Sequence, residues 1–291
     1  MKFFKNVLRI GLFFLTVFQL KAQDWPSPNG VMINNFGWND GGRPVLGIIF
    51  SAEGGIEASG QGEILFQGGT SSGVSALPSP LGAWTALDHG NGIISVYSRM
   101  DEKNERPDLP FIIEKNTVLG YAGASGWSAI NGFYFFLYDR KERRWLNPSM
   151  ITNPKPDNRP PVINAVWLRN AEGRVIDPAQ IRTLSQGRYF ISVSAVDTML
   201  TANEAPLAPF RIICSVNGIE TGSLNFETYL ARDGSLMVYR NGLVPVREVF
   251  FPQPGWEAGE ISFTRGQANL EVIVQDYSGN SRRALYRLQI E

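Results

Sequence analysis

The sequence predicts an all-β protein built from two domains. Its 291 residues include 30 glycines, and turn-forming residues recur about every ten residues, as they do between short strands. Segments between these turns alternate apolar and polar residues, which is the period of a strand with one buried face. No long stretch shows the periodicity of an amphipathic helix. These three observations together favour strands joined by tight turns throughout the chain.

The first 22 residues are expected to be a secretory signal peptide. Lys2, Lys5 and Arg9 precede an apolar run over residues 10–20, and Ala22 is the expected last residue before cleavage. The run is short for a stop-transfer helix, although an uncleaved anchor is the alternative. No later segment is long and apolar enough to span a membrane. The mature chain is therefore expected in the periplasm or elsewhere in the cell envelope.

Charge and cysteine content narrow the classes of partner. Residues 1–22 contain four basic and no acidic residues, so the remainder holds 23 basic against 27 acidic residues. A mildly acidic exported chain has no electrostatic footprint for nucleic acid or for anionic lipid. Cys214 is the single cysteine, which rules out an intrachain disulfide and indicates a buried strand residue.

A proline-rich stretch divides the mature chain. Residues 153–161 contain four prolines, which cannot pair inside a sheet and therefore predict a semi-rigid linker. The expected organisation is a first domain over residues 23–152 and a second over residues 162–291. Each part is long enough for its own core, so two independently folding units are expected.

The second domain shows the clearest strand pattern. Alternating segments lie at 189–196, 212–216, 270–274 and 284–290, and Asn-Gly or Asp-Gly turns occur at 217–218, 233–234 and 241–242. Some seven short strands with this spacing predict an immunoglobulin-like β-sandwich. Asp197 and Asp276 follow strands and could serve as calcium ligands. Caps of the local turn backbone are the alternative for both side chains.

The order of glycine-rich segments in the first domain carries a family resemblance. These segments lie at 36–52, 56–64, 88–97, 113–126 and 131–138, and are followed by Leu-Asn-Pro at 146–148. Together they resemble the M23 (LytM-like) peptidoglycan endopeptidases over residues 34–150. The resemblance implies an M23-like β domain, built on the duplicated hybrid motif, that carries a zinc site in the family.

The same resemblance places the family's site positions in this chain. The first histidine ligand corresponds to Val45, the aspartate ligand to Ile49, and the last zinc-binding histidine to Phe136. The two catalytic histidines correspond to Arg99 and Tyr134. The resemblance therefore implies a degenerate member of the family, a pseudoenzyme that has lost its metal site.

The side chains at these positions predict that neither zinc nor another cofactor is bound. Zinc needs three ligands from histidine, cysteine or carboxylate, and Val45, Ile49 and Phe136 offer none. An empty polar pocket would leave unpaired groups, so we expect apolar core there, with Phe136 pointing inward. The single histidine, His89, is expected to be a hydrogen-bonded turn residue. No nucleophile–base pair is evident from the sequence.

The groove above the former metal site is a candidate binding surface. Arg99 and Tyr134 are expected at its floor, and Tyr97 and Trp127 nearby, where aromatic rings could stack on a peptide or glycan. The alternative is that these rings simply pack the sheet.

By resemblance, the favoured function is non-catalytic recognition of the cell wall. The partner would be peptidoglycan, or a cell-wall hydrolase or division protein, because degenerate members of the family act as binding or regulatory modules. One alternative is an M23-type metalloendopeptidase with atypical ligands, and another is a structural envelope scaffold.

Overall fold

A computed structural model describes residues 23–69, 79–104, 106–128, 130–153, 155–198, 205–251 and 255–291. The expected signal peptide lies outside these residues. The described chain is all-β, as predicted, with three short 3-10 turns at Glu102–Asn104, Pro148–Met150 and Val246–Glu248. Within the described ranges, no helix has the length and apolar character needed to cross a membrane.

Strands of the first half are mostly short and joined by tight turns, as the glycine content predicts. They are β1 (Val31–Asn34), β2 (Asn39–Asp40), β3 (Arg43–Pro44), β4 (Ile48–Ser51), β5 (Gly55–Glu57), β6 (Gly62–Gly68), β7 (Ala83–Asp88), β8 (Ile93–Met100), β9 (Ile112–Ile113), β10 (Val118–Tyr121), β11 (Gly132–Asp139) and β12 (Arg144–Leu146).

Strands of the second half are longer and include every segment whose alternation was clear in the sequence. They are β13 (Val162–Asn170), β14 (Val175–Ile176), β15 (Thr183–Leu184), β16 (Gly187–Val196), β17 (Arg211–Val216), β18 (Ile219–Arg232), β19 (Ser235–Arg240), β20 (Leu243–Pro245), β21 (Trp256–Phe263), β22 (Gly266–Gln275) and β23 (Ser281–Ile290).

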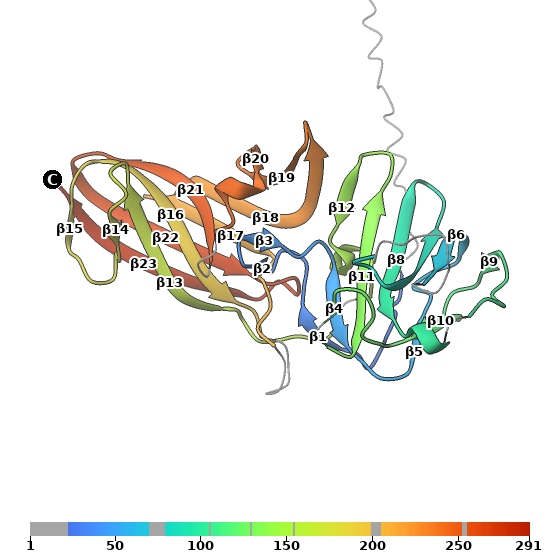
Figure 1. Ribbon diagram of the computed structural model, residues 1–291. Coiled ribbons are helices and arrows are strands. Elements are labelled where there is room, and N and C mark those ends of the chain that lie inside the picture. The colour runs from blue at the N-terminus through green and yellow to red at the C-terminus, as the bar shows by residue number, and fades with distance from the viewer. Residues whose placement is uncertain are drawn as a thin grey trace, which may run out of the picture.

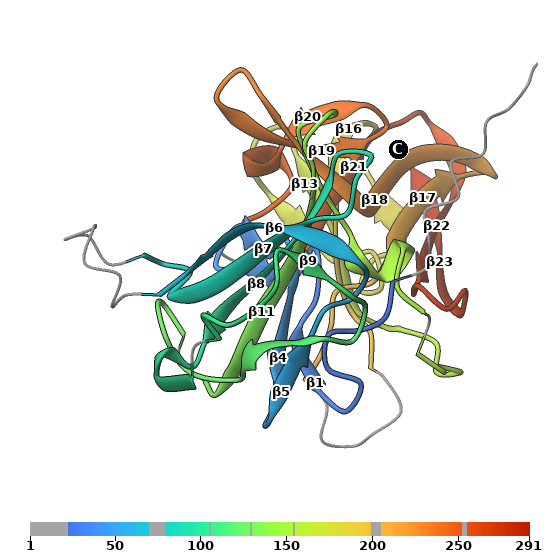
Figure 2. The same cartoon turned by 90° about the vertical axis from the view of Figure 1, so that its right-hand side faces the viewer.

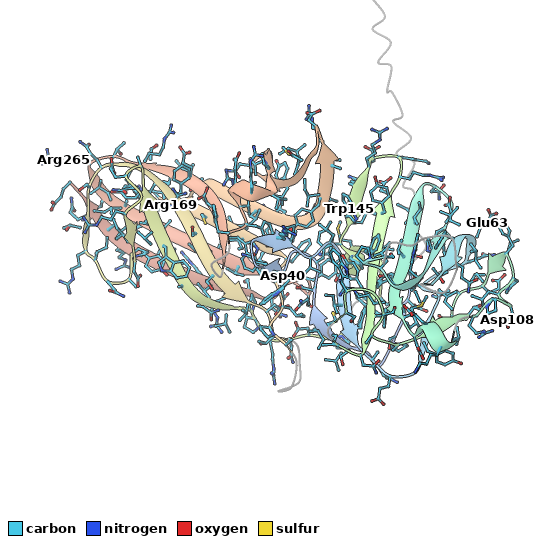
Figure 3. The ribbon with its side chains drawn as sticks, viewed as in Figure 1. Asp40, Glu63, Asp108, Trp145, Arg169 and Arg265 are labelled. Atoms are coloured by element: carbon cyan, nitrogen blue, oxygen red, sulfur yellow. The ribbon has the colours of Figure 1, made fainter. Side chains whose placement is uncertain are left out.

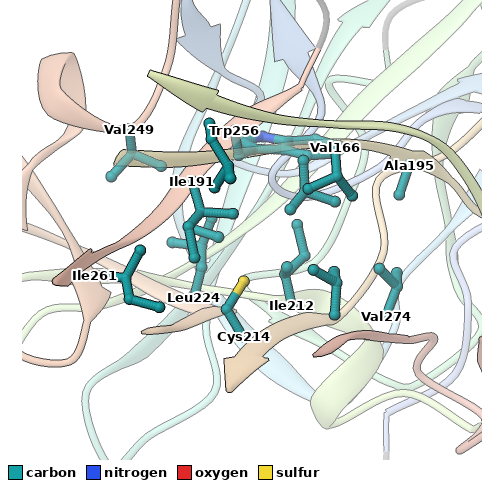
Figure 4. Packing of buried hydrophobic residues seen from close by; sticks show 14 of the residues in the cluster. Val166, Ile191, Ala195, Ile212, Cys214, Leu224, Val249, Trp256, Ile261 and Val274 are labelled. Carbon is teal, nitrogen blue, oxygen red and sulfur yellow. The ribbon is translucent and has the colours of Figure 1, made fainter. Parts of the chain in front are cut away.

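The second half forms a sandwich of two sheets (Figure 1). One layer has the order β14-β13-β16-β21, and the other runs β15-β23-β22-β17-β18. Buried residues of both layers form one apolar core, and Figure 4 shows Cys214 among its aliphatic and aromatic neighbours. Burial raises the pKa of the Cys214 thiol to about 12, so it is an inert core residue, as the sequence indicated.

The first half forms a second core around its own central strands. Pairing runs through β4, β11, β8, β7, β6 and β9, and residues such as Phe50, Tyr97 and Phe135 are fully buried beneath it. Figure 2 shows these strands as a group in the foreground, with the strands of the sandwich behind them. Buried residues thus form two clusters, one mostly from the first half and one mostly from the second half.

The two halves are nevertheless joined by a shared sheet. β12 pairs antiparallel with β18, with Trp145 opposite Tyr229, so one sheet continues from the first half into the sandwich. Each core also contains a residue of the other half: Phe36 packs in the sandwich core, and Leu207 packs in the first core. This organisation does not favour the two independently folding units expected from the sequence.

The proline-rich linker is held by both halves. Trp25 Nε1 donates to the Asn153 carbonyl over 2.7 Å, and Lys155 Nζ donates to the Gly30 carbonyl over 3.1 Å. From the sandwich side, Asn280 Nδ2 donates to the Asp157 carbonyl over 3.3 Å. Composition predicted a segment that cannot pair in a sheet, but it did not reveal these side-chain contacts.

Phe36 provides a test of the interlocking. Its ring is 1% exposed and lies 4.9 Å from the Tyr229 ring, while Gly37 at φ 86° permits the approach of the Phe226 ring. We expect Phe36→Ala to lower the free energy of unfolding by about 3–5 kcal/mol, because a large buried ring is deleted. Urea unfolding monitored by fluorescence measures this change.

The matched control is Phe111→Ala, because Phe111 is 64% exposed and its loss should change stability by no more than about 0.5 kcal/mol. Equal stabilities of wild type and Phe36→Ala would contradict a core shared between the halves.

Candidate functional site

The floor of the candidate site is the outer face of three neighbouring strands. In the sheet, Tyr134 of β11 lies opposite Ile49 of β4 on one side and Ser98 of β8 on the other. Alternation along β11 sends Phe133, Phe135 and Leu137 into the first core, where each is at most 1% exposed. Tyr134 and Phe136 therefore share the opposite face of the strand.

A glycine allows the segment before β4 to lie directly on this face. A Cβ atom on Gly47 would collide with the Phe135 carbonyl oxygen and would lie 2.9 Å from the Tyr134 ring. The main chain of Leu46 hydrogen-bonds the Tyr134 hydroxyl. Burial raises the pKa of Tyr134, so this phenol stays protonated at neutral pH. Tyr134 is thus fixed at both its ring and its hydroxyl.

Arg99 brings a positive charge onto the same face. Its Cζ atom lies 5.0 Å from the centroid of the Tyr134 ring, a cation–π contact. Its backbone is in the left-handed region at φ 65°, where its N–H donates to the Leu81 carbonyl over 2.7 Å. Burial lowers the pKa of Arg99, and the nearby Tyr134 and Asp40 partly oppose that shift.

Four of the five positions assigned by resemblance meet at this place. Ile49, Tyr134 and Arg99 are placed there by pairing and stacking, and the Phe136 ring lies 5.4 Å from the Tyr134 ring. Val45 is buried on the approach to β4, and its N–H and carbonyl bond the 37–38 backbone.

The site lies at the junction of the two halves. Figure 3 places Asp40 and Trp145 in the middle of the molecule, between the sandwich and the first-half sheet. Trp145 packs against the sandwich core and meets the Tyr138 ring edge-on at 5.2 Å. Asn39 Nδ2 donates to the Phe251 and Gly255 carbonyls, which fixes the β2–β3 hairpin to the sandwich. Junctions of this kind are common locations for binding sites.

Two expectations from the sequence are corrected by the structure. Phe136 was expected to be core, but it is half-buried and faces away from the first core, because Phe135 occupies the inward position. Tyr97 was expected near the groove, but it is 0% exposed, and its hydroxyl accepts the Ser59 N–H over 2.8 Å inside the core. Tyr97 therefore cannot contact a ligand on the surface.

Trp127 is the most exposed aromatic side chain of the described residues, at 75%. Its loop is held against the 79–83 segment: its N–H donates to the Pro80 carbonyl, and Ser125 Oγ accepts the Ala83 N–H. Gly82 makes this approach possible, because a Cβ there would collide with Ser125. The same segment accepts the Arg99 N–H at Leu81, so Trp127 and Arg99 are anchored to one loop.

His89 is a hydrogen-bonded turn residue, as expected, within a polar network that the sequence did not reveal. Its Nδ1 lies 2.7 Å from the Gln61 carbonyl oxygen, and its Nε2 lies 2.7 Å from Ser95 Oγ. A carbonyl oxygen can only accept, so Nδ1 is the donor to Gln61. The Ser95 hydroxyl donates onward to the Tyr97 hydroxyl over 3.1 Å. Ser95 is 0% exposed, so this serine–histidine pair is inaccessible to a substrate and stabilises the fold.

Three carboxylates meet at the linker. Asp157, Asp197 and Asp276 each place an oxygen within 4.8 Å of the others, a donor set that suits a hard cation such as calcium. Burial raises the pKa of Asp276, hydrogen bonds from Asn280 oppose the shift, and Asp157 adds to it. Asp276 caps its turn by accepting the Asn280 N–H over 2.8 Å, which agrees with the alternative role weighed for it. The contribution of Asp157 was not foreseen.

Comparison with known proteins gives a family match over the sandwich and structural similarities over parts of the chain. One protein family, without a functional description, matches residues 160–291. No curated protein matches the chain.

Among solved structures, the chain is similar to the catalytic domain of the prophage-encoded M23 protein EnpA from Enterococcus faecalis. The identity is 19%, the TM-score is 0.36, and 43% of this chain and 94% of that chain are covered. A zinc-containing peptidase from Vibrio cholerae gives 15% identity, a TM-score of 0.36, and coverage of 47% and 41%. Lysostaphin, the antimicrobial peptidase of Staphylococcus simulans, gives 15% identity, a TM-score of 0.37, and coverage of 83% and 98%.

These three structural neighbours are peptidases, and each is similar to this chain only at low identity. The chemistry of the site in this chain is therefore inferred from its own side chains.

The two faces of β11 can be separated by substitution. We expect Phe135→Ala to cost about 3–5 kcal/mol, because the ring is fully buried in the first core. Phe136→Ala should cost less, about 1–2 kcal/mol, because its ring is only half-buried. Parallel urea unfolding curves measure both values. A larger loss for Phe136→Ala would mean that this position, which the resemblance matches to a zinc ligand, is core after all.

The His89 network predicts a pH dependence of stability. Burial lowers the pKa of His89 below its usual 6.5, so the unfolded chain takes up the proton first. The stability that depends on neutral His89 should be fully present above pH 6.5. It should be lost as the pH falls through 6.5 toward the lowered pKa of His89 in the folded state. The loss is measured by melting temperatures recorded from about pH 8 to about pH 5, because this range spans the titration of histidine.

His89→Gln is the control for that measurement, because it removes the titration while keeping a polar side chain. Its melting temperature should change less over the same range. Parallel profiles for wild type and variant would show that His89 does not cause the loss. The pKa of Asp276 is raised, so its titration changes stability with pH in the opposite direction to that of His89. This effect is the same in wild type and variant, so it cancels when their profiles are subtracted.

Proposed function

We propose that this chain is an exported, non-catalytic cell-envelope protein that recognises peptidoglycan through the surface around Arg99, Tyr134 and Trp127. In this proposal, the first domain is a degenerate M23-like domain and the second domain is an immunoglobulin-like β-sandwich. The observation that carries it is the Arg99–Tyr134 stack, which stands where the resemblance expects two catalytic histidines.

The donor set at the former metal site does not fit zinc. The side chains at the three ligand positions are two aliphatic groups and a phenyl ring, and none has a lone pair for a metal. The chain has one histidine, and both of its ring nitrogens lie at hydrogen-bonding distance from protein oxygens. A pseudoenzyme accounts for these side chains without requiring a ligand from elsewhere.

The side chains present suit recognition. Tryptophan, tyrosine and arginine are the residues that most often dominate binding energy at interfaces. Trp127 is exposed on a loop fixed by hydrogen bonds, so little conformational freedom is lost when it is covered. Its indole offers a flat face for a sugar ring or a peptide unit, and Arg99 offers hydrogen-bond donors. Peptidoglycan contains both kinds of group.

Binding to purified sacculi tests the proposal. We expect wild type to sediment with sacculi, and Trp127→Ala to bind at least about tenfold more weakly, a loss of about 1.4 kcal/mol. Phe111→Ala is the matched control, because it removes another exposed aromatic ring, at the end of the chain segment that leads to β9. Equal binding by Trp127→Ala and wild type would exclude this surface.

The remaining outcomes separate the alternatives. Elemental analysis is expected to find no stoichiometric zinc, and turbidity of cell-wall suspensions should stay constant. One zinc per chain, together with clearing that chelation abolishes, would instead establish a metalloendopeptidase with atypical ligands. No retention on sacculi would favour a hydrolase or division partner, or a structural envelope scaffold.

A further inference from the structure

Arg99 is a partly desolvated cation without a close anionic partner among the described residues. Its Nε atom is buried and has no hydrogen-bond acceptor, and no carboxylate of the described chain lies within 4.0 Å of its guanidinium. Asp40 acts on it only at longer range. By contrast, Arg240 and Arg169, which are also partly buried, both pair with Glu257.

The stack on Tyr134 does not satisfy this guanidinium. The five N–H donors of arginine lie in the plane of the group, whereas the contact with the ring is made through the carbon at its centre. The ring therefore orients the guanidinium and leaves in-plane donors for another group. A desolvated charge with unused donors is unfavourable unless a ligand completes it.

The backbone of Arg99 adds a second indication. A non-glycine residue at φ 65° is uncommon, and this conformation is held by the bond to Leu81. Strain of this kind persists where the surrounding structure enforces it, often at binding sites. Here it keeps the Arg99 side chain over Tyr134.

We infer that the ligand of this surface places a carboxylate on the Arg99 guanidinium. The inference rests on the proposed function, because it names the group recognised at the same site. A carboxylate matches two parallel N–H donors of arginine and replaces the missing counter-charge. The nearby Asp40 adds negative potential, which disfavours a phosphate dianion more than a carboxylate monoanion.

Three acetylated dipeptides test whether Arg99 binds a carboxylate, and whether that carboxylate belongs to a peptide C-terminus or to a side chain. The probes are acetyl-Ala-Ala with a free C-terminal carboxylate, the same dipeptide as its C-terminal amide, and acetyl-Ala-Glu-amide with a side-chain carboxylate. Binding is measured by NMR titration of the full mature chain. At least one carboxylate probe should bind at least about tenfold more tightly than the amide, and the better of the two identifies the source. Equal binding of all three, or no binding of any at millimolar concentration, overturns the inference.

Variants show whether Arg99 is the group responsible. Arg99→Gln should abolish the preference for carboxylate over amide, whereas Arg143→Gln should retain it. Arg143 is matched because its backbone also lies in the left-handed region, at φ 53°, while the residue is exposed on the β11–β12 turn. A preference that survives in Arg99→Gln overturns the inference. Inorganic phosphate competing better than acetate overturns the choice of carboxylate.

Stability of the unliganded protein provides an independent readout. If Arg99 awaits an anion, Arg99→Gln should keep or raise the melting temperature, because an unpaired, partly buried charge is removed. A marked fall in Tm, without any change in probe binding, would indicate a purely structural arginine.

Binding to chemically modified sacculi distinguishes the failure of this inference from the failure of the proposed function. Sacculi whose carboxylates have been converted to methylamides should retain at least about tenfold less protein than untreated sacculi. Equal retention on both refutes the carboxylate while leaving wall recognition intact. Absence of retention on both, with dipeptide discrimination preserved, refutes wall recognition alone.

Discussion

The two-residue period of β11 is the constraint on which both the core and the site depend. One face of this strand supplies Phe133, Phe135 and Leu137 to the first core, and pairing with β4 and β8 fixes its register. The other face must then carry Tyr134 and Phe136 outward. A shift of one residue would bury Tyr134 and expose Phe135, so the register that forms the core also assembles the site.

The pairing of β12 with β18 extends this order into the sandwich. The edge of the first sheet is covered by a long strand of the second, so neither half presents that edge to solvent. Phe36 and Leu207 cross the boundary in opposite directions and place each half in the core of the other. At this junction, the bonds of Asn39 to the sandwich hold the β2–β3 hairpin, and Asp40 of that hairpin acts electrostatically on Arg99.

Sequence reasoning predicted the all-β fold class correctly because that class depends on local patterns. Alternation, turn residues and the proline-rich stretch are visible at short range, and the strands at 189–196 and 270–274 formed as expected. The placement of Phe136 was wrong because two adjacent phenylalanines carry no signal about which one faces inward. Tyr97 was misplaced for the same reason: facing is set by pairing with strands far along the chain.

The contacts that the sequence could not supply are those between distant segments. Nothing local indicates that His89 meets Ser95 beneath Gln61, that Asp157 joins Asp197 and Asp276, or that Trp25 bonds the linker. The sequence indicated only two of these three carboxylates, Asp197 and Asp276, as possible calcium ligands. It did not indicate Asp157. The fixed loop beneath Trp127 could have been suspected from Gly82 and Gly126, whose close approach requires glycine.

The proposed function implies that a metal pocket has been replaced by other side chains, and the choice of those side chains has a physical reason. A partial ligand set would be the least favourable arrangement, since one buried histidine or aspartate without its ion leaves an unsatisfied polar group. Apolar residues at all three ligand positions avoid that cost. A positive centre is nevertheless present, because Arg99 stands on the face where the resemblance places the ion. Zinc acts on a ligand as a Lewis acid, whereas a guanidinium attracts negative charge and donates hydrogen bonds without activating water. On the proposed function, the Arg99 guanidinium would therefore hold a ligand at this surface rather than cleave it.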